Sequence, residues 1–86
     1  MTESHQLFFY YREGCHLCEE LASLLHRGWP RVAGQLKWSD VDSRREWRER
    51  YGSRVPALVC GDEVVCELLP DRERIQEYFG PPENPL

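Results

Sequence analysis

The sequence predicts an α/β fold in which a four-stranded mixed sheet carries helices on both faces, with the element order β-α-β-α-β-β-α. Short apolar runs alternate along the chain with longer stretches whose apolar residues recur at helical spacing. Two of these runs, in the second half of the chain, are separated by only two turn-forming residues, which indicates a β-hairpin. Because a helix connects the first two strands, these strands should be parallel, and the hairpin adds an antiparallel pair.

The first half of the chain begins with a strand, a helix and a second strand. Residues 6–11 are apolar and aromatic, so they predict a buried strand. Residues 15–27 carry leucines at helical spacing and predict a helix, which Pro30 prevents from continuing. Residues 28–34 are predicted to form a connection. Residues 35–42 partly alternate in polarity and predict a strand, whose lysine and serine suit an edge position or one exposed face.

The second helix is predicted from a start signal and a narrow apolar stripe. Ser43 and Glu46 have the spacing of a capping box, and Asp42 is an alternative N-cap. Trp47 and Tyr51 lie four residues apart and therefore on one face of the helix. The remaining positions are polar, so we expect only this stripe to pack on the sheet.

The hairpin is predicted over residues 55–60 and 63–67, with a Gly-Asp turn between them. It also predicts the directions of two cysteines. With a regular two-residue turn and alternating side chains, Cys60 and Cys66 should face opposite sides of the sheet and should not form a disulfide. We interpret both as small buried or half-buried apolar residues.

The last helix is predicted to begin near Pro70 and Asp71, because proline is allowed in a first helical turn, and to end at Gly80. Residues 1–80 then form a single domain. Residues 81–86 contain three prolines, cannot continue the helix, and are predicted to be a mobile tail.

Composition narrows the functional classes. The 86 residues suit one domain with a modest core, and the net charge of −4 argues against nucleic acid as a partner. The chain shows neither a secretory signal at its start nor an apolar run of membrane-spanning length. We therefore expect a cytoplasmic location and no membrane partner. In that reducing compartment the four cysteines should be thiols or a redox pair, not a structural disulfide framework.

Two cysteines, Cys15 and Cys18, lie where the first strand ends and the first helix begins. Cys15 should occupy a helix N-terminus, where unpaired backbone N–H groups and the helix dipole favour a thiolate. Cys-x-x-Cys beside a βαβ pattern is typical of a thioredoxin-like redox site. We predict Cys15 as the nucleophile and Cys18, on the apolar side of the helix, as the resolving thiol.

The residues around this dithiol leave several alternatives open. Arg12 and a protonated His16 would lower the pKa of Cys15, whereas the neighbouring glutamates would raise it. His16 is either a tuning or acid–base group or an exposed residue at the helix start. The cysteines themselves could be two buried residues without chemistry. No metal site is expected, because zinc needs about four ligands and only Cys15, Cys18 and one histidine converge here.

Several stretches of the chain resemble the glutaredoxin-like branch of the thioredoxin superfamily, in particular short bacterial proteins. They are Tyr11-Arg12-Glu13-Gly14-Cys15-His16-Leu17-Cys18-Glu19-Glu20, Val41-Asp42 and Tyr51-Gly52-Ser53-Arg54-Val55-Pro56-Ala57-Leu58. The resemblance implies a thioredoxin-like fold. It also implies a cis bond between Val55 and Pro56 beside the dithiol, with the Val55 backbone contacting bound peptide or glutathione. The residues alone would favour an ordinary trans proline at a strand start.

The chain departs from this branch at one expected binding segment. Glutaredoxins have a Gly-Gly pair followed by Asp, which receives the γ-glutamyl end of glutathione, whereas this chain has no glycine over residues 66–71. Arg12 stands near the basic residue that glutaredoxins keep before the dithiol. From the resemblance and the motif together, we assign Arg12, His16, Val55 and Pro56 to substrate binding.

The favoured hypothesis is a thiol-disulfide oxidoreductase that uses the Cys15 and Cys18 dithiol. A non-catalytic thioredoxin-like binding module or redox sensor is the second hypothesis, and a metal or iron–sulfur carrier is the third. We expect a monomer whose partner is a disulfide-containing protein or glutathione. No resident cofactor is expected, and glutathione would act as a co-substrate.

Overall fold

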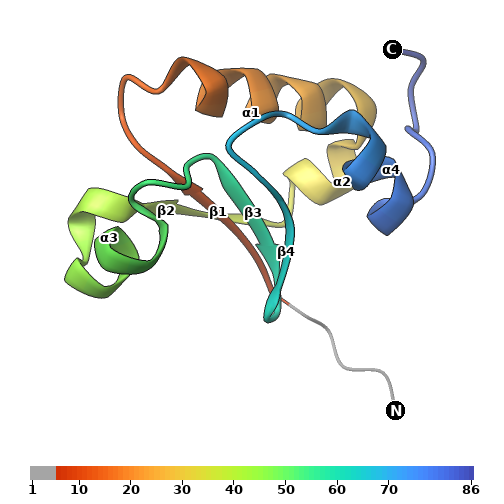
Figure 1. Ribbon diagram of the computed structural model, residues 1–86. Coiled ribbons are helices and arrows are strands. Elements are labelled where there is room, and N and C mark those ends of the chain that lie inside the picture. The colour runs from red at the N-terminus through yellow and green to blue at the C-terminus, as the bar shows by residue number, and fades with distance from the viewer. Residues whose placement is uncertain (1–5) are drawn as a thin grey trace.

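The structure, a computed structural model, describes residues 6–86 and confirms the α/β architecture (Figure 1). The elements are β1 (Leu7–Tyr11), α1 (His16–Gly28), α2 (Pro30–Ala33), β2 (Leu36–Asp40), the 3₁₀ turn η1 (Val41–Ser43), α3 (Arg45–Tyr51), β3 (Ala57–Cys60), β4 (Glu63–Glu67) and α4 (Arg72–Phe79). The sheet has the strand order β2-β1-β3-β4. β1 is parallel to β2 and antiparallel to β3, so the sheet is mixed, and β2 lies at an edge as predicted.

Helices cover both faces of the sheet because side chains of β1 alternate between two cores. Phe9 is fully buried with Leu25 in a cluster that includes residues of α1, α2 and α4. Tyr10 points to the other face, where its ring stacks on Tyr51 of α3 at 4.1 Å between centroids. The ring of Trp47, the other member of the predicted stripe, packs in an edge-to-face arrangement with the ring of Tyr10, with 5.7 Å between centroids. The narrow apolar stripe therefore docks α3 as expected.

The predicted connection over residues 28–34 contains one additional helix, α2. Pro30 is its first residue, a position where the missing backbone N–H costs no helical hydrogen bond. Trp29, just before it, is buried, and its indole Nε1 donates to the Gly80 carbonyl at 2.8 Å. This bond joins the start of α2 to the end of α4.

The predicted capping box at Ser43 is wrong. Val41–Ser43 form the turn η1, and the Ser43 hydroxyl donates back to the Asp40 carbonyl at 2.7 Å. α3 begins at Arg45 after Arg44, with no side-chain cap. Asp42, the alternative cap, is instead engaged by arginines from other parts of the chain. The ion pairs of Asp42 with Arg12 and with Arg48 of α3, together with the turn, have therefore replaced the local capping interaction.

The predicted directions of Cys60 and Cys66 are also wrong, because β4 contains an irregularity that the sequence did not reveal. Cys60 pairs with Glu63 as predicted, but the register shifts between Leu58 and Val59, so that Leu58 lies opposite Cys66. Such a bulge reverses the facing of the residues beyond it. Both cysteines consequently pack against the same cluster beneath α1 and α4, and both are free thiols.

The C-terminal segment packs against the end of α1. Glu83 donates its backbone N–H to the Gly28 carbonyl at 2.6 Å, and the Asn84 amide donates to the Arg27 carbonyl at 3.0 Å. These bonds satisfy carbonyls that a helix C-terminus otherwise leaves without partners. The absence of a side chain at Gly28 leaves room for Leu86. The mobility of residues 81–86 stays a prediction. Over residues 6–86, no helix is long and apolar enough to cross a membrane.

Candidate redox site

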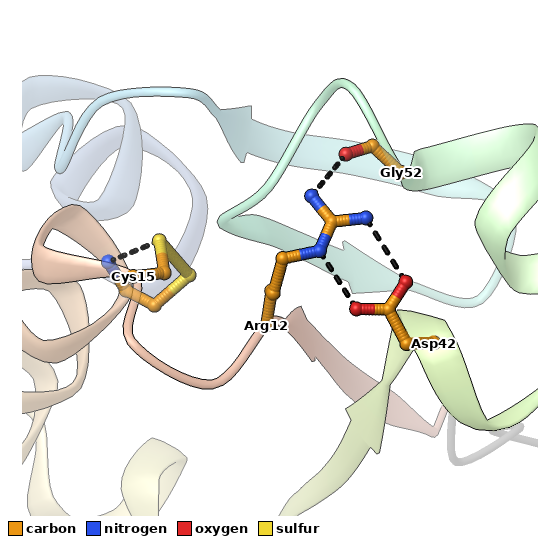
Figure 2. Close-up of a disulfide and its surroundings, with 5 residues drawn as sticks. Arg12, Cys15, Asp42 and Gly52 are labelled. Atoms are coloured by element: carbon orange, nitrogen blue, oxygen red, sulfur yellow. Dashed lines mark hydrogen bonds and ion pairs between the residues drawn. A yellow bond between two sulfur atoms is a disulfide. The ribbon is translucent and has the colours of Figure 1, made fainter.

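The dithiol lies at the start of α1, at the end of the turn that leaves β1. Cys15 is the N-cap residue, and the structure contains a disulfide between Cys15 and Cys18 (Figure 2). The Cys18 backbone N–H donates to the Cys15 sulfur at 3.1 Å. Cys18 is only 4% exposed, whereas Cys15 is half-buried. The expected contrast between an accessible first cysteine and a shielded second one is therefore confirmed.

The turn before Cys15 depends on one glycine. Gly14 has a φ of 80°, a left-handed backbone conformation that favours glycine. The Cys15 backbone N–H donates to the Arg12 carbonyl at 3.2 Å and closes the turn. The chain thereby leaves the carboxyl end of β1 and enters α1 within a few residues. This edge of an α/β sheet is where ligands bind most often.

A groove of about 350 Å³ opens beside the disulfide, between α1 and the edge strand β2. Its walls combine aromatic rings, the disulfide and carboxylates. The lining residues are Tyr11, Arg12, Glu13, Gly14, Cys15, Cys18, Glu19, Ala22 and Trp38. Sequence reasoning did not identify Trp38 or the two glutamates as site residues. The available signal for Trp38 was a large aromatic residue in a strand predicted to lie at an edge.

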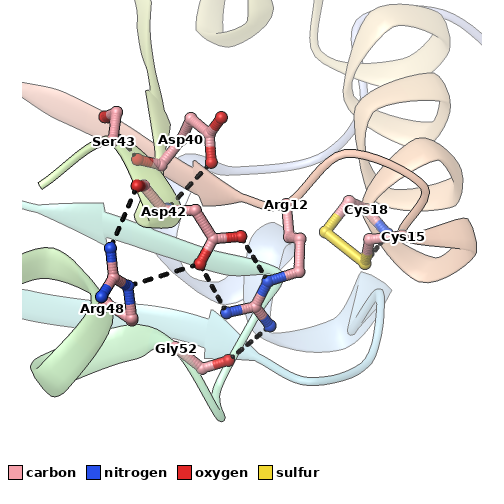
Figure 3. A network of polar contacts seen from close by, with 8 residues as sticks. All are labelled: Arg12, Cys15, Cys18, Asp40, Asp42, Ser43, Arg48 and Gly52. Atoms are coloured by element: carbon pink, nitrogen blue, oxygen red, sulfur yellow. Dashed lines mark hydrogen bonds and ion pairs between the residues drawn. A yellow bond between two sulfur atoms is a disulfide. The ribbon is translucent and has the colours of Figure 1, made fainter.

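Arg12 is held in an ion-pair network on the side of the loop away from α1 (Figure 3). Its guanidinium donates to both Asp42 oxygens, at 2.8 and 3.1 Å, and to the Gly52 carbonyl at 2.9 Å. The hydrogen bonds from Arg12 hold the pKa of Asp42 below its usual value, and Asp42 in turn raises the pKa of Arg12. Arg48 lies 3.6 Å from the same carboxylate.

This network gives Arg12 a clear structural role. It ties the loop that leads to Cys15 to η1 and to the end of α3. Asp42 balances the Arg12 charge, so the guanidinium is not a free cation beside the sulfurs. Substrate binding by Arg12 stays a prediction, and an anionic ligand would have to compete with Asp42.

His16 lies at the surface of α1, with its side chain 82% exposed and its Nε2 3.0 Å from the Glu20 carboxylate. It is not among the residues that line the groove. Of the two interpretations from sequence, the arrangement matches the exposed residue at a helix start. Its assignment to substrate binding stays a prediction.

The Val55–Pro56 bond is cis, as the family resemblance implied, although the residues alone favoured a trans bond. Pro56 is buried and immediately precedes Ala57, which pairs with Tyr10 of β1. Because β1 and β3 are antiparallel neighbours, the start of β3 lies beside the carboxyl end of β1. Pro56 is therefore at the same end of the strands as the loop that carries Cys15. The strand order places Pro56 on the β3 side of that loop and the groove on the β2 side.

Comparison with known proteins agrees with this arrangement. The model of a glutaredoxin-like domain family (DUF836) matches residues 6–80. The chain belongs to this family. The solution NMR structure of protein Ne2328 from Nitrosomonas europaea is similar, with 32% sequence identity, a TM-score of 0.64, and coverage of 91% of this chain and 94% of that chain. No match is found among curated proteins.

In this glutaredoxin-like domain, the segment after β4 carries two exposed leucines, Leu68 and Leu69. Leu68 has a φ of 74°, which is strained for a residue with a branched side chain, and its backbone N–H donates to the Pro56 carbonyl at 2.8 Å. The backbone here thus adopts a conformation that suits glycine, although the residue is leucine. The backbone bond from Leu68 joins this segment to the cis-proline.

Within residues 6–86, no three histidine, cysteine, aspartate or glutamate side chains are grouped in a way that could hold an ion. A charged pair lies next to the cis-proline segment. Arg54, just before Val55, donates to both Glu67 oxygens at 3.0 and 2.5 Å, and these hydrogen bonds lower the pKa of Glu67. This pair joins the segment before β3 to the end of β4.

Proposed function

We propose that this glutaredoxin-like domain is a thiol-disulfide oxidoreductase, with Cys15 as the nucleophile and Cys18 as the resolving thiol. One observation carries the proposal. A half-buried cysteine at the N-cap of a long helix is joined by a disulfide to a buried cysteine one turn further along. Only the first can meet a large substrate, and the second lies within reach of the first.

The thiol-disulfide exchange takes place in two steps. In the reduced protein, the Cys15 thiolate attacks one sulfur of a substrate disulfide, which forms a mixed disulfide and releases one substrate thiolate. Cys18 then loses its proton to water or to the released thiolate and attacks the Cys15 sulfur. The Cys15–Cys18 disulfide forms, and the second substrate thiolate leaves. Two electrons pass from the protein dithiol to the substrate.

The local structure supports Cys15 as the attacking group. The N–H of Cys18 points at its sulfur at 3.1 Å, and the dipole of the 13-residue helix α1 favours negative charge at that position. Both effects stabilise the thiolate, which is the reactive form in disulfide exchange. Cys18 lies beneath the first turn of α1 among apolar residues, so it is shielded until the mixed disulfide brings a sulfur within its reach.

The proposed substrate is a disulfide-containing protein, with glutathione as the alternative co-substrate. The Val55 backbone, next to Pro56 at the sheet edge, would contact an extended substrate segment. Leu68 and Leu69 support a protein substrate, since these exposed apolar residues lie in the segment where, by the resemblance, glutaredoxins have the glycine pair that receives glutathione. We further propose a monomer in a reducing, cytoplasmic setting, without a resident cofactor.

The test measures thiol reactivity and turnover together. Rates of alkylation of the reduced protein between pH 4 and 10, with each cysteine followed by mass spectrometry, should give a pKa for Cys15 below the ~8.5 of a free cysteine. The reduced protein should also reduce 2-hydroxyethyl disulfide, a small neutral substrate. An ordinary Cys15 pKa with no reduction would contradict the proposal and favour a binding module whose dithiol has no catalytic role.

A further inference from the structure

The groove beside the disulfide is lined by an exposed tryptophan and by glutamates, and none of these side chains takes part in the disulfide exchange itself. On the α1 side it is bordered by Ala22 and Glu19, and on the β2 side by Trp38, which is 55% exposed. A volume of about 350 Å³ is at the lower end of the range for ligand sites, roughly 300–1,000 Å³. The groove therefore suits one side chain of a larger partner.

The aromatic wall is held in place although it faces solvent. Trp38 packs edge-to-face against Tyr11, with 5.5 Å between ring centroids, and against Phe9 at 4.6 Å. Phe9 is fully buried, so it anchors the exposed indole to the core. A large aromatic ring fixed at the surface, one strand away from the disulfide loop, offers a rigid apolar and π-electron surface to a ligand.

The rim of the groove is acidic. Glu13 and Glu19 are exposed and line it, and within residues 6–86 neither carboxylate forms an ion pair. Arg12, the cation among the lining residues, is balanced by Asp42. The neighbouring hollow beyond Trp38 is lined by His26 and Arg27, so the negative end of this surface is the end beside the disulfide.

The groove combines the aromatic surface of Trp38 with the unpaired carboxylates of Glu13 and Glu19, and this combination complements one kind of side chain. Arginine and lysine have an apolar stem and a cationic head, and the head is attracted by both carboxylates and aromatic rings. We infer that this groove receives a basic side chain of a disulfide-bearing polypeptide, placed near the cysteine that Cys15 attacks. The inference rests on the proposed function and specifies its substrate: a disulfide in a basic segment.

The experiment uses peptide disulfides that differ in one residue. Homodimeric disulfides of one short peptide carry arginine, citrulline or glutamate, in turn, at each position within three residues of the cysteine. Citrulline matches arginine in shape without its charge. The full chain is reduced, and the second-order rate constant for each disulfide is measured in a single turnover. Dividing it by the rate constant with dithiothreitol cancels intrinsic differences between the peptides.

At the best position, the arginine peptide should react about tenfold faster than the glutamate peptide, with citrulline in between. The preference should shrink when the ionic strength is raised to ~0.5 M, because exposed charges are screened. Trp38→Ala should slow the reaction of the arginine peptide severalfold more than that of 2-hydroxyethyl disulfide. Equal normalised rates for arginine and glutamate at every position would overturn the inference.

Two variants of the same charge change provide the matched control. Glu19→Gln removes a groove carboxylate, whereas Glu20→Gln removes the next carboxylate of α1, which lies outside the groove and contacts His16. The arginine-to-glutamate ratio should fall severalfold in Glu19→Gln, nearly vanish when Glu13→Gln is added, and stay unchanged in Glu20→Gln. This ratio is independent of any change in Cys15 reactivity, because both peptides meet the same thiolate.

The outcomes separate the two proposals. Normal reduction of 2-hydroxyethyl disulfide without a preference for arginine would overturn the groove inference alone. An equal loss of preference in Glu19→Gln and Glu20→Gln would also overturn it, since the effect would then come from the overall charge of α1. No reduction of any disulfide would overturn the proposed function, and this inference with it.

Discussion

The molecule carries two cysteine pairs whose surroundings differ in every respect that governs thiol chemistry. Cys15 and Cys18 lie three residues apart at the start of α1, where Cys15 is half-buried and its sulfur receives a backbone N–H. Cys60 and Cys66 lie on the β3–β4 hairpin and pack into the core beneath α1 and α4. Burial raises the pKa of the Cys66 thiol above its usual value. From this difference in position we expect a difference in reactivity between the two pairs.

Cys60 differs from its partner in one contact. Its thiol lies beside the Tyr78 hydroxyl, and their hydrogen bond raises the pKa of Tyr78 to about 12. Cys60 is only half-buried, so burial shields it less than Cys66. It nevertheless lacks the helix N-terminus that favours a thiolate at Cys15. We therefore treat both hairpin cysteines as packing residues, and the predictions below compare them with the dithiol.

The largest expected difference is in catalysis. Cys15→Ser should reduce disulfide reduction to the uncatalysed background, because the hydroxyl replaces the attacking thiolate. Cys60→Ser, the matched control on the hairpin, should keep most of the activity. Cys18→Ser should accumulate a mixed disulfide on Cys15, visible by mass spectrometry. Equal loss of activity in Cys60→Ser and Cys15→Ser would contradict the distinction between a catalytic cysteine and a packing cysteine.

The next difference is in alkylation. In the folded, reduced protein at pH 7, Cys15 should react with iodoacetamide at least about a hundredfold faster than Cys66, since Cys66 is 6% exposed and its pKa is raised. Cys60 should lie between them. Peptide mapping after timed quenching measures all of these rates in one sample. In ~6 M guanidinium, where the fold is lost, the rates should converge; persistence of the contrast there would show that structure is not its cause.

A smaller effect is expected on stability. Cys66→Ala removes a buried sulfur from the core and should lower the free energy of unfolding by about 1 kcal/mol, with little effect on disulfide reduction. Urea unfolding of both reduced proteins measures the difference. Cys60→Ala should cost less, because that side chain is only half-buried. A larger cost for Cys60→Ala would reverse our order of the hairpin cysteines.

The smallest effects concern the ion pairs near each cysteine pair. Hydrogen bonds from Arg54 lower the pKa of Glu67, so this pair stabilises the fold above the unfolded-state pKa of about 4.3, and the contribution disappears as pH falls through the lowered pKa. Glu67→Gln should therefore cost about 1 kcal/mol or less at pH 7 and nothing near pH 2. Chemical unfolding at both pH values measures the difference.

Asp42→Asn provides the comparison on the dithiol side. The sign of its pH dependence is the same, because Arg12 lowers the pKa of Asp42. The expected loss at pH 7 is smaller than for Glu67→Gln, since Arg12 and Asp42 are more exposed than Arg54 and Glu67. A greater loss from Asp42→Asn would show that the loop before Cys15 depends on this network more than its exposure implies.

The sequence by itself was sufficient for the features that arise from local spacing. The helix start at Cys15, the shielding of Cys18, the edge position of β2 and the docking of Tyr51 all follow from residues within about one helical turn or one strand of one another. Backbone hydrogen bonding in helices and strands repeats over such distances, so apolar spacing indicates it directly. The cis bond before Pro56 was predicted only from the family resemblance, because the residues alone favoured a trans bond.

Tertiary structure decided what depends on residues distant in the chain. The bulge near Leu58 brought Cys66 to the face of Cys60, and Asp42 became the partner of Arg12, 30 residues away, instead of a helix cap. The groove at Trp38 exists only because β2 lies parallel to β1 and beside α1. A register shift or an ion pair is selected by competition among many long-range contacts, and no local pattern encodes which of them wins. For this reason the sequence was sufficient to propose Cys15 as the nucleophile, whereas the surroundings from which we infer its substrate required the fold.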